Sequence, residues 1–374
     1  MTITPAQRAT LDEAEQSESA ALSLRAQAEA FEAEALALRA SVYAELDAPP
    51  VVVPPIPPVV IPPIVVPPVD PPKPPATTAL VLRNKVGAVI DGGTYSSIYV
   101  SGGSGNTIRN VEVIAPPATN INEQAVRVVK SPGFVIEGCT ITGQATTVGV
   151  DQTDAGPAGL VKWLWAGEGI HVEGSPDADI RGNVISRFHQ GVTFTGDRVT
   201  IADNRITDIR TSFIVGVPGD DCAITGNYLS GSHPWRWGTT PGGDHADCVH
   251  LWLNGATCDG LQIIGNTFDQ GDGEAILGFN LQHINVGVGV GKFINTVIAR
   301  NKVTLGQGQA FVLRGVSGKV YDNEIVALAT GKATAQMRVY ETQGLPLTIS
   351  GTIGAVAVDT RLTAAQRALV TVLP

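Results

Sequence analysis

One recurring phrase, apolar-x-x-Asn-x-apolar, limits what this chain can fold into more than any other feature of the sequence. Its copies are NTIRNVEV, VIEGCTIT, DIRGNVIS, TIADNRIT, AITGNYLS, QIIGNTFD, VIARNKVT and KVYDNEIV. The position that they share is occupied, in chain order, by Asn110, Cys139, Asn183, Asn204, Asn227, Asn266, Asn301 and Asn323. Uninterrupted copies lie 21, 22 or 23 residues apart, the length of one parallel β-helix coil, and spacings of 29, 44, 39 and 35 residues indicate coils with insertions. We therefore predict that the seven asparagines stack at one corner as scaffold residues, with amide hydrogen bonds between coils.

A strand that alternates strictly between apolar and polar residues precedes many of these phrases, as in AVRVV, GIHVEG, GVTFTG, CVHLWLNG and AFVLRGV. The alternation places one residue of each strand in the core: Val126, Ile170, Val192, Val249 and Phe311. It places the following residue of each strand in one column on the surface: Arg127, His171, Thr193, His250 and Val312. These strands predict a mainly β chain that folds as a solenoid.

The N-terminal residues 1–47 have a different composition, rich in Ala, Glu and Leu, that predicts a helix. A heptad pattern places small residues at position a, namely Ala14, Ala21, Ala28, Ala35 and Val42, and larger ones at position d, namely Leu24, Phe31 and Leu38. This seam suits partner helices, so we predict a helical segment that anchors and oligomerises the protein. The alternative is a lone amphipathic helix that lies on another protein.

Residues 48–78 contain more than half of the 25 prolines, and such a run favours extended polyproline II. We interpret it as a semi-rigid stalk, with a ligand for proline-binding modules as the alternative. The solenoid is predicted to span residues 79–345. Residues 346–374 lack the asparagine phrase, and we expect them to cap the open end of the solenoid or to join subunits.

The charge balance excludes several classes of partner. A net charge of -10 and a pI near 5.1 argue against nucleic acid. The only long apolar stretch is broken by proline every few residues, which argues against membrane insertion. The N-terminus has no basic and apolar regions of a signal peptide, so we expect synthesis in a cytoplasm without classical export. The cysteines lack metal-ligand spacing and are interpreted as free thiols in the solenoid wall: Cys139, Cys222, Cys248 and Cys258.

The asparagine corner, the coil length and the glycine-punctuated strands resemble the right-handed parallel β-helix proteins of the pectate-lyase-like superfamily. The superfamily includes lyases, hydrolases, epimerases and catalytically silent adhesins. The helix and stalk in front of a β-helix resemble bacteriophage tail spikes and fibres. This resemblance implies an extracellular virion protein, made in the host cytoplasm, that is a homotrimer, docks to the virion or tail through residues 1–47 and binds host surface polysaccharide.

The stretch DHADCVHLW is similar to a His-x-Asp-x-apolar-Gln phrase of some proteins in this superfamily. His245 and Asp247 match the phrase, whereas His250 stands where Gln is expected. The Asp-Pro-His phrase of alginate-type lyases and epimerases is absent from the sequence.

Two large insertions, about 142–167 and 230–247, are expected to enter at one corner of the solenoid, where loops on a rigid scaffold commonly build binding sites. They carry four of the five tryptophans, and the fifth lies on the wall beneath: Trp163, Trp165, Trp235, Trp237 and Trp252. Aromatic rings stack on the apolar faces of sugars, so this cluster predicts a carbohydrate-binding groove. The alternative is that the tryptophans only pin the loops to the wall.

The candidate catalytic groups near this corner are His245, Asp247, His250, Asp272 and Glu274, with Asp269 close by. Glycoside hydrolysis needs two carboxyl groups about 5–9.5 Å apart, whereas a lyase needs a base beside a uronate. No cofactor is expected, except a divalent cation if the protein is a lyase. No metal site is predicted, and His171, beside Glu168 and Glu173, is interpreted as a satisfied surface histidine. Three functions therefore remain open: a glycan-binding phage spike or fibre, a polysaccharide lyase or glycoside hydrolase, and a purely structural decoration fibre.

Overall fold

The computed structural model describes ten segments of the chain, which are residues 78–118, 122–144, 167–233, 247–270, 277–284, 291–305, 309–328, 336–341, 344–358 and 362–373. All of them belong to the second of the two units into which the chain divides, Asp70–Pro374. The predicted helix over residues 1–47 and the stalk up to residue 77 lie outside these segments. Within the described segments, no helix is long and apolar enough to cross a membrane.

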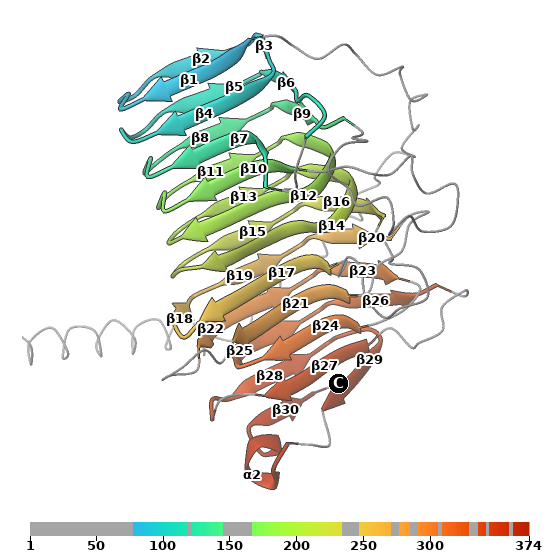
Figure 1. Ribbon diagram of the computed structural model, residues 1–374. Helices are drawn as coiled ribbons and strands as arrows, with labels where there is room; N and C mark the ends of the chain where they lie inside the picture. Colours follow the sequence, from blue (N-terminus) through green and yellow to red (C-terminus); the bar gives the residue numbers. More distant parts are fainter. Residues whose placement is uncertain are drawn as a thin grey trace, which may run out of the picture. The chain divides into compact units, whose positions relative to one another are not determined.

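The described strands form three walls, and within each wall the strands run parallel to one another (Figure 1). Most coils contribute one strand to each wall in turn. Wall 1 contains β1 (Ala79–Arg83), β4 (Ser97–Ser101), β7 (Gln124–Val129), β10 (Glu168–Glu173), β17 (Asp247–Asn254), β21 (Leu277–Ile284), β24 (Gln309–Arg314), β27 (Gln336–Glu341) and β29 (Ala355–Val358). Two long strands, β12 (Val184–Gly196) and β14 (Arg205–Pro218), begin in wall 3 and end in wall 1. Wall 2 contains β2 (Val89–Asp91), β5 (Thr107–Arg109), β8 (Val135–Glu137), β11 (Asp179–Arg181), β13 (Thr200–Ala202), β15 (Ala223–Thr225), β18 (Thr257–Asp259), β19 (Gln262–Ile264), β22 (Lys292–Ala299), β25 (Val316–Tyr321), β28 (Leu347–Ser350) and β30 (Val370–Val372).

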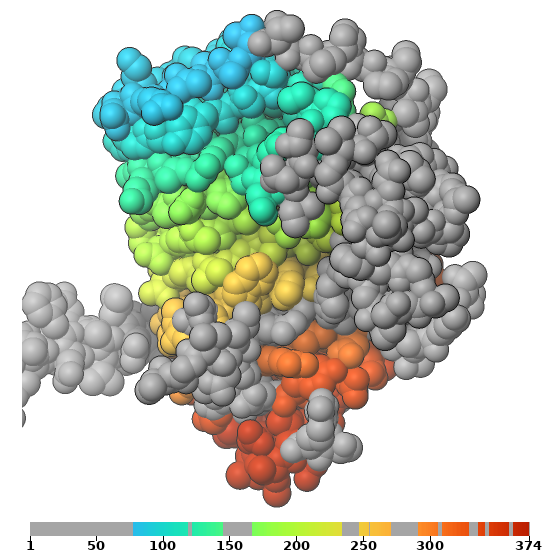
Figure 2. Space-filling view, in the orientation of Figure 1, coloured from blue at the N-terminus to red at the C-terminus, as the bar shows by residue number. Residues whose placement is uncertain are grey.

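Wall 3 contains β3 (Thr94–Tyr95), β6 (Glu112–Ile114), β9 (Thr140–Thr142), the first part of β12 and of β14, β16 (Tyr228–Ser232), β20 (Thr267–Asp269), β23 (Lys302–Leu305) and β26 (Glu324–Ala327). The chain runs from wall 1 to wall 2 to wall 3 and back. Successive coils lie one beside the next, and they form the successive colour bands of Figure 2. The predicted parallel β-helix is therefore confirmed, and its right-handed coil has the hand that parallel crossovers adopt in nearly all proteins.

The core consists of apolar side chains that stack in rows between coils. In wall 2 one row contains isoleucines with no exposed surface: Ile108, Ile136, Ile180, Ile201, Ile224, Ile263 and Ile298. In wall 1 the predicted inward residues are equally buried: Val126, Ile170, Val192, Val249 and Phe311. β-branched side chains suit this position because they pack well against the same residue in the coil above and below.

A ladder of buried asparagines joins consecutive coils at the corner between walls 2 and 3. Its members are Asn183, Asn204, Asn227, Asn266, Asn301 and Asn323, each at most 1% exposed. Each side-chain amide of the first five donates to the Oδ1 of the next asparagine at 2.9–3.0 Å, and the backbone N–H of the same residue donates to that oxygen at 3.0 Å. Cys139 begins the ladder, since its backbone N–H donates to Asn183 Oδ1 at 3.0 Å.

Asn110 does not belong to this ladder, which corrects the prediction of seven stacked asparagines. It is exposed and has a φ of 54°, the conformation of Asp203 just before Asn204 in a later coil. The ladder position of its own coil is occupied instead by Val111, which is 1% exposed. The phrase NTIRNVEV is therefore displaced by one residue, and Asn110 donates to the exposed Asp91 at 2.8 Å.

Two further expectations differ from the structure. Val312 lies in the predicted surface column but is only 3% exposed. Its partner in the next coil is Arg338, and both Arg338 and Arg314 lie over the ring of Tyr340, at 5.1 and 4.5 Å, so long side chains occupy this part of the outer face. The coil pattern also continues beyond residue 345, because β28 and β30 extend wall 2 and β29 extends wall 1, with the short helix α2 (Ala364–Arg367) between β29 and β30.

Candidate functional site

The two large insertions both lead from wall 3 into wall 1. Residues 145–166 lie between β9 and β10, and residues 234–246 lie between β16 and β17. Strands β10, β12, β14 and β17 are neighbours in wall 1, so the two entry points lie at one corner, three coils apart, which is about 14 Å at about 4.8 Å per strand. Several predicted site residues lie outside the described segments: Trp163, Trp165, Trp235, Trp237, His245, Asp272 and Glu274.

The structure places His171 and His250, which are both partly exposed, in the same row of wall 1, although Val215 between them is only 2% exposed. The row passes from Arg127 through His171, Thr193 and Val215 to His250, each residue being the Cα partner of the next. A second row, which we call the corner row, runs along the start of the strands and contains Gln124, Glu168, Gln190 and Ser212, with Asp247 at the start of β17. Each histidine therefore follows a corner-row carboxylate by three residues.

At β17 the corner carboxylate is Asp247, which is 1% exposed. Its Oδ2 lies 3.1 Å from Nδ1 of His250, whose side chain is 24% exposed. The indole ring of Trp252 contacts the same imidazole, with ring centroids 4.9 Å apart and an angle of 70° between the planes. Of the predicted site residues, the structure therefore brings Asp247, His250 and Trp252 together.

At β10 the structure repeats this arrangement with Glu168, whose side chain is 9% exposed. Its Oε2 lies 2.6 Å from Nδ1 of His171, and the opposite ring nitrogen lies 3.9 Å from Oε2 of Glu173. Glu173 also faces Arg127 at 3.7 Å. The interpretation of His171 as a surface histidine satisfied by its neighbours Glu168 and Glu173 is therefore confirmed, and the structure adds that the Glu168–His171 pair lies in the same row as the Asp247–His250 pair.

The alternation of buried and exposed residues is broken where these pairs form. Residues three apart on a regular strand point to opposite faces, but here three consecutive residues are buried in each strand: Glu168, Gly169 and Ile170 in β10, and Asp247, Cys248 and Val249 in β17. The alternation is thus broken at the corner. The sequence signal was present as acid-x-apolar-His in EGIH and DCVH, both directly after an insertion.

The arrangement is suited to proton exchange or to hydrogen bonding with a hydroxyl group. An ionised carboxylate accepts a hydrogen bond from Nδ1–H, fixes the tautomer and directs Nε2 away from itself. The outer nitrogen of a neutral imidazole held in this way is an acceptor for an O–H donor. In the described part of the chain, no group of three or more His, Cys, Asp or Glu side chains could hold a metal ion.

The predicted carboxylate partners of Asp247 are less well supported. Asp269 ends β20 of wall 3, so it lies across the corner from the start of β17. Asp272 and Glu274 follow it outside the described segments. The described residues therefore provide carboxylate–histidine pairs rather than the paired carboxylates of a glycosidase.

The four cysteines are free and buried, as the sequence predicted. Burial raises the pKa of Cys248, which is adjacent to Asp247, well above its usual value, and the negative charge of that carboxylate adds to the effect. Burial likewise raises the pKa of Cys222 to about 11. Because the thiolate is the reactive form, none of these groups is suited to act as a nucleophile.

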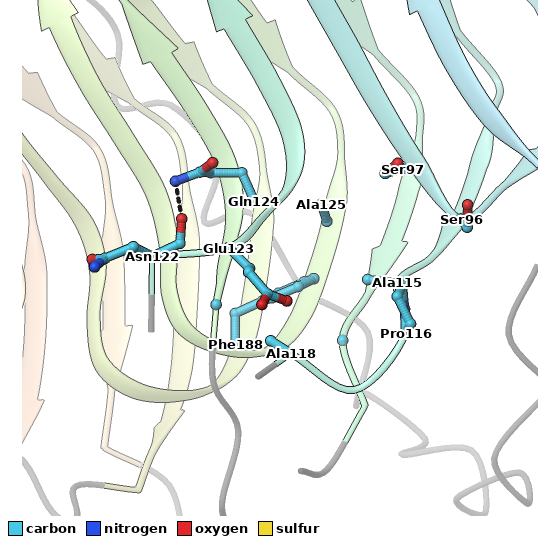
Figure 3. A pocket seen from close by; sticks show the side chains of 12 residues that line it. Ser96, Ser97, Ala115, Pro116, Ala118, Asn122, Glu123, Gln124, Ala125 and Phe188 are labelled. Carbon is cyan, nitrogen blue, oxygen red and sulfur yellow. Dashed lines mark hydrogen bonds between the residues drawn. The ribbon is translucent and has the colours of Figure 1, made fainter. Parts of the chain in front are cut away.

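A cleft with a volume of about 380 Å³ lies at the same corner, on the N-terminal coils (Figure 3). Its lining residues are Ser96, Ser97, Ala115, Pro116, Ala118, Asn122, Glu123, Gln124, Ala125, Gly143, Gly167 and Phe188. Gln124 belongs to the corner row, and Gly167 directly precedes Glu168. The sequence did not predict this cleft, since its walls come from four coils.

Comparison with known proteins gives a family match over part of the chain. The family model described as periplasmic copper-binding protein (NosD) matches residues 105–234. No curated protein matches the chain in sequence.

Several solved structures are similar to the chain at low sequence identity. The surface adhesin PfbA of Streptococcus pneumoniae is 10% identical with a TM-score of 0.48, and the match covers 78% of this chain and 69% of that chain. A pectin methylesterase in complex with a hexasaccharide is 13% identical with a TM-score of 0.35, covering 78% of this chain and 86% of that chain. The Dettilon tailspike protein is 13% identical with a TM-score of 0.31, covering 79% of this chain and 60% of that chain. These similarities assign no activity to the chain, whose parallel β-helix fold is established by its own strand pairing.

Proposed function

We propose that this protein is a spike or fibre of a bacteriophage virion that binds a host surface glycan through wall 1. The observation that carries the proposal is the row that places the partly exposed His171 and His250 on one face, each paired with a buried carboxylate, with Trp252 against the second histidine. Both pairs begin where an insertion enters the wall. Hydrogen-bonding groups and an aromatic ring on a rigid wall are the features that sugar recognition requires.

The geometry of the wall supports a linear ligand. The two pairs are separated by three strand spacings, about 14 Å, and the strands between them are held by continuous parallel pairing. A rigid surface loses little conformational entropy on binding, so its polar groups contribute their full hydrogen-bond energy. A polysaccharide that extends across several coils can contact both pairs.

The virion assignment is supported by the first 78 residues of the sequence. The heptad seam of residues 1–47 favours a trimer that docks to the virion or tail, and the proline-rich residues 48–78 favour a stalk between the anchor and the β-helix. We accordingly place the protein on the outside of the virion, in contact with the host surface.

A polysaccharide lyase or glycoside hydrolase is the second candidate function. The observation that favours it is the 3.1 Å contact between buried Asp247 and His250 Nδ1, because a carboxylate that orients an imidazole is a common general-base arrangement. A decoration fibre without a glycan ligand is the third candidate, and it requires that neither pair contact a sugar.

One experiment separates these candidates. The full-length protein is incubated with purified surface polysaccharides of candidate hosts, and both retention of the polysaccharide and shortening of its chains are measured. Replacement of Trp252 by alanine should weaken retention by about two- to tenfold, the contribution of one aromatic contact. Asp247→Asn keeps the shape and removes the charge, so an enzyme loses turnover with binding retained, and an adhesin gives no product in either form.

Glu137→Gln on wall 2 is the matched control, because Glu137 pairs at 3.0 Å with Arg181 on a different face. It should leave both measurements unchanged. If the unaltered protein retains no polysaccharide, or if Trp252→Ala binds as the unaltered protein does, the proposed glycan surface on wall 1 is wrong.

A further inference from the structure

Two arginines meet one tyrosine ring on the C-terminal coils of wall 1. They come from β24 and β27, which are neighbours in the wall (Figure 1). The guanidinium carbons of Arg314 in β24 and Arg338 in β27 lie 4.5 and 5.1 Å from the ring centroid of Tyr340. All three residues are partly exposed, so the group reaches the surface of the wall.

The tyrosine ring is held at its hydroxyl end. The Tyr340 hydroxyl donates to Gln309 Oε1 at 2.9 Å, and Gln309 begins β24. The side chain of Tyr340 therefore connects β27 with β24. Because a guanidinium group over the face of an aromatic ring is attracted by it, the fixed ring also positions the guanidinium of Arg314.

The N–H groups of Arg314 are not used within the protein. In the described part of the chain Arg314 forms no hydrogen bond and no ion pair, and its Nε is buried without a partner. Its Nη nitrogens also lack hydrogen bonds but are not buried, so they can reach a ligand. In contrast, Arg127 on wall 1 and Arg181 on wall 2 contact glutamate carboxylates at 3.7 and 3.0 Å. Arg314 is thus held by stacking and keeps its hydrogen-bond donors.

The strand register places Arg314 in the same row as Trp252. The Cα partner of Trp252 in β21 is Gln282, which follows Leu281. The partner of Leu281 in β24 is Leu313, which directly precedes Arg314. Arg314 is therefore two strands from Trp252, about 10 Å at about 4.8 Å per strand. A glycan that stacks on Trp252 and extends toward the C-terminal coils passes this guanidinium group.

The chemistry of the guanidinium group selects an anionic ligand. Its planar fork of N–H donors matches the oxygens of a carboxylate or a phosphate, and such charge-assisted hydrogen bonds are about twice as strong as those to a neutral hydroxyl group. The net charge of -10 repels an acidic polymer at long range. That repulsion is screened beyond about 8 Å at physiological salt, so the contact at Arg314 determines the preference.

From these observations we infer that the glycan bound by wall 1 is acidic, and that Arg314 binds the carboxylate or phosphate group of one of its units. The inference rests on the proposed function, because it names the class of glycan that this wall takes. Trp252 supplies the stacking surface and Arg314 supplies the selectivity for charge.

The test uses the full-length protein and two matched pairs of probes. Oligogalacturonate is compared with its neutral methyl ester, and phosphorylated dextran is compared with dextran, so each pair differs only in charge. Affinities measured by biolayer interferometry should favour an acidic probe over its neutral counterpart. Arg314→Gln should lower the affinity for that acidic probe by about threefold to tenfold and leave its neutral counterpart unchanged. The pair that shows the loss identifies a carboxylate or a phosphate as the ligand.

The matched control is Arg205→Gln on wall 3, where the guanidinium carbon of Arg205 lies 4.6 Å from the ring centroid of Tyr228. It should preserve the preference for the acidic probe. Glu341→Gln should preserve or increase this preference, because it removes a negative charge from the residue in register with Arg314.

The inference is overturned if no probe binds, if Arg314→Gln leaves the preference unaltered, or if either control variant loses it. Failure of the proposed function is distinguishable. Equal binding of acidic and neutral probes that Trp252→Ala weakens would overturn the role of Arg314 and leave the glycan surface standing. Binding that Trp252→Ala leaves unchanged would instead contradict the glycan surface itself.

Discussion

Replacement of Asn266 by leucine tests whether the asparagine ladder holds the coils together. The Oδ1 of Asn266 accepts from the backbone N–H of Asn227 at 3.0 Å and from its side-chain amide at 2.9 Å. The Nδ2 of Asn266 donates to Ile224 O at 2.8 Å and to Asn301 Oδ1 at 2.9 Å. Leucine has similar size but offers neither a donor nor an acceptor.

The expected loss follows from the groups left without partners. Asn227 retains one amide hydrogen bond, to Ile201 O at 2.8 Å, but loses the acceptor for its second amide proton and for its backbone N–H. Two orphaned buried donors cost about 1–3 kcal/mol each, or about 2–6 kcal/mol together. Burial of the leucine side chain offsets about 1.5–3 kcal/mol. The free energy of unfolding should therefore fall by about 2 kcal/mol.

Chemical denaturation and hydrogen exchange measure this effect at two levels. Coils of a solenoid contact mainly their neighbours, so the damage should be local, and exchange of the Asn227 amide should accelerate more than exchange in distant coils. Asn110→Gly is the control, because Asn110 is exposed, has a φ of 54° that glycine adopts readily, and should change stability by no more than about 0.5 kcal/mol. An unchanged midpoint with a protected Asn227 amide, or equal destabilisation by both substitutions, would refute the ladder as a source of stability.

Three further predictions concern the reactivity of the thiols, the stability of the protein at acid pH and its oligomeric state. Burial raises the pKa of Cys222 from 9.0 to about 11, so a thiol reagent at neutral pH should label it only after unfolding, and rapid labelling of the native protein would contradict its burial. Hydrogen bonds from Asn110 and Arg109 lower the pKa of exposed Asp91 in the folded protein. Asp91 therefore stabilises the folded protein at pH values above its pKa in the unfolded chain, and this stabilisation is lost as the pH falls through its lower pKa in the folded protein. The stability difference between the protein and Asp91→Asn should accordingly narrow below about pH 4, and a constant difference would contradict this assignment. Native mass measurement should give a trimer for the full-length protein and a smaller species for a form that lacks residues 1–76, and a monomeric full-length protein would contradict the heptad interpretation.

Much of the scaffold could be predicted from the sequence because its signals are local and repeated. The asparagine phrase gave the coil length, and six of the seven asparagines occupy the predicted ladder. Alternation gave the buried residues Val126 and Val249 correctly. In the coil of Asn110 the ladder position was predicted one residue too early, since Val111 and not Asn110 occupies it. The phrase alone does not show which residue adopts a positive φ and which one points into the core.

The candidate site depended more on tertiary structure. The sequence placed His171 and His250 in one column, since both follow an inward residue of an alternating strand. It also placed Glu168 and Glu173 beside His171, but it did not predict that Asp247 pairs with His250 in the same way, because alternation assigns residues three apart to opposite faces. The start of each strand, where three consecutive residues are buried, departs from that alternation.

The cleft could not be predicted from local sequence patterns. Ser97, Glu123, Gly167 and Phe188 come from four coils, and insertions of unequal length separate them along the chain. Coil length and core direction were determined by the sequence because each depends on a few adjacent residues. The carboxylate–histidine pairs and the cleft were decided by the tertiary structure, because they depend on how the chain bends at a corner and on which residues the parallel register then places one above another.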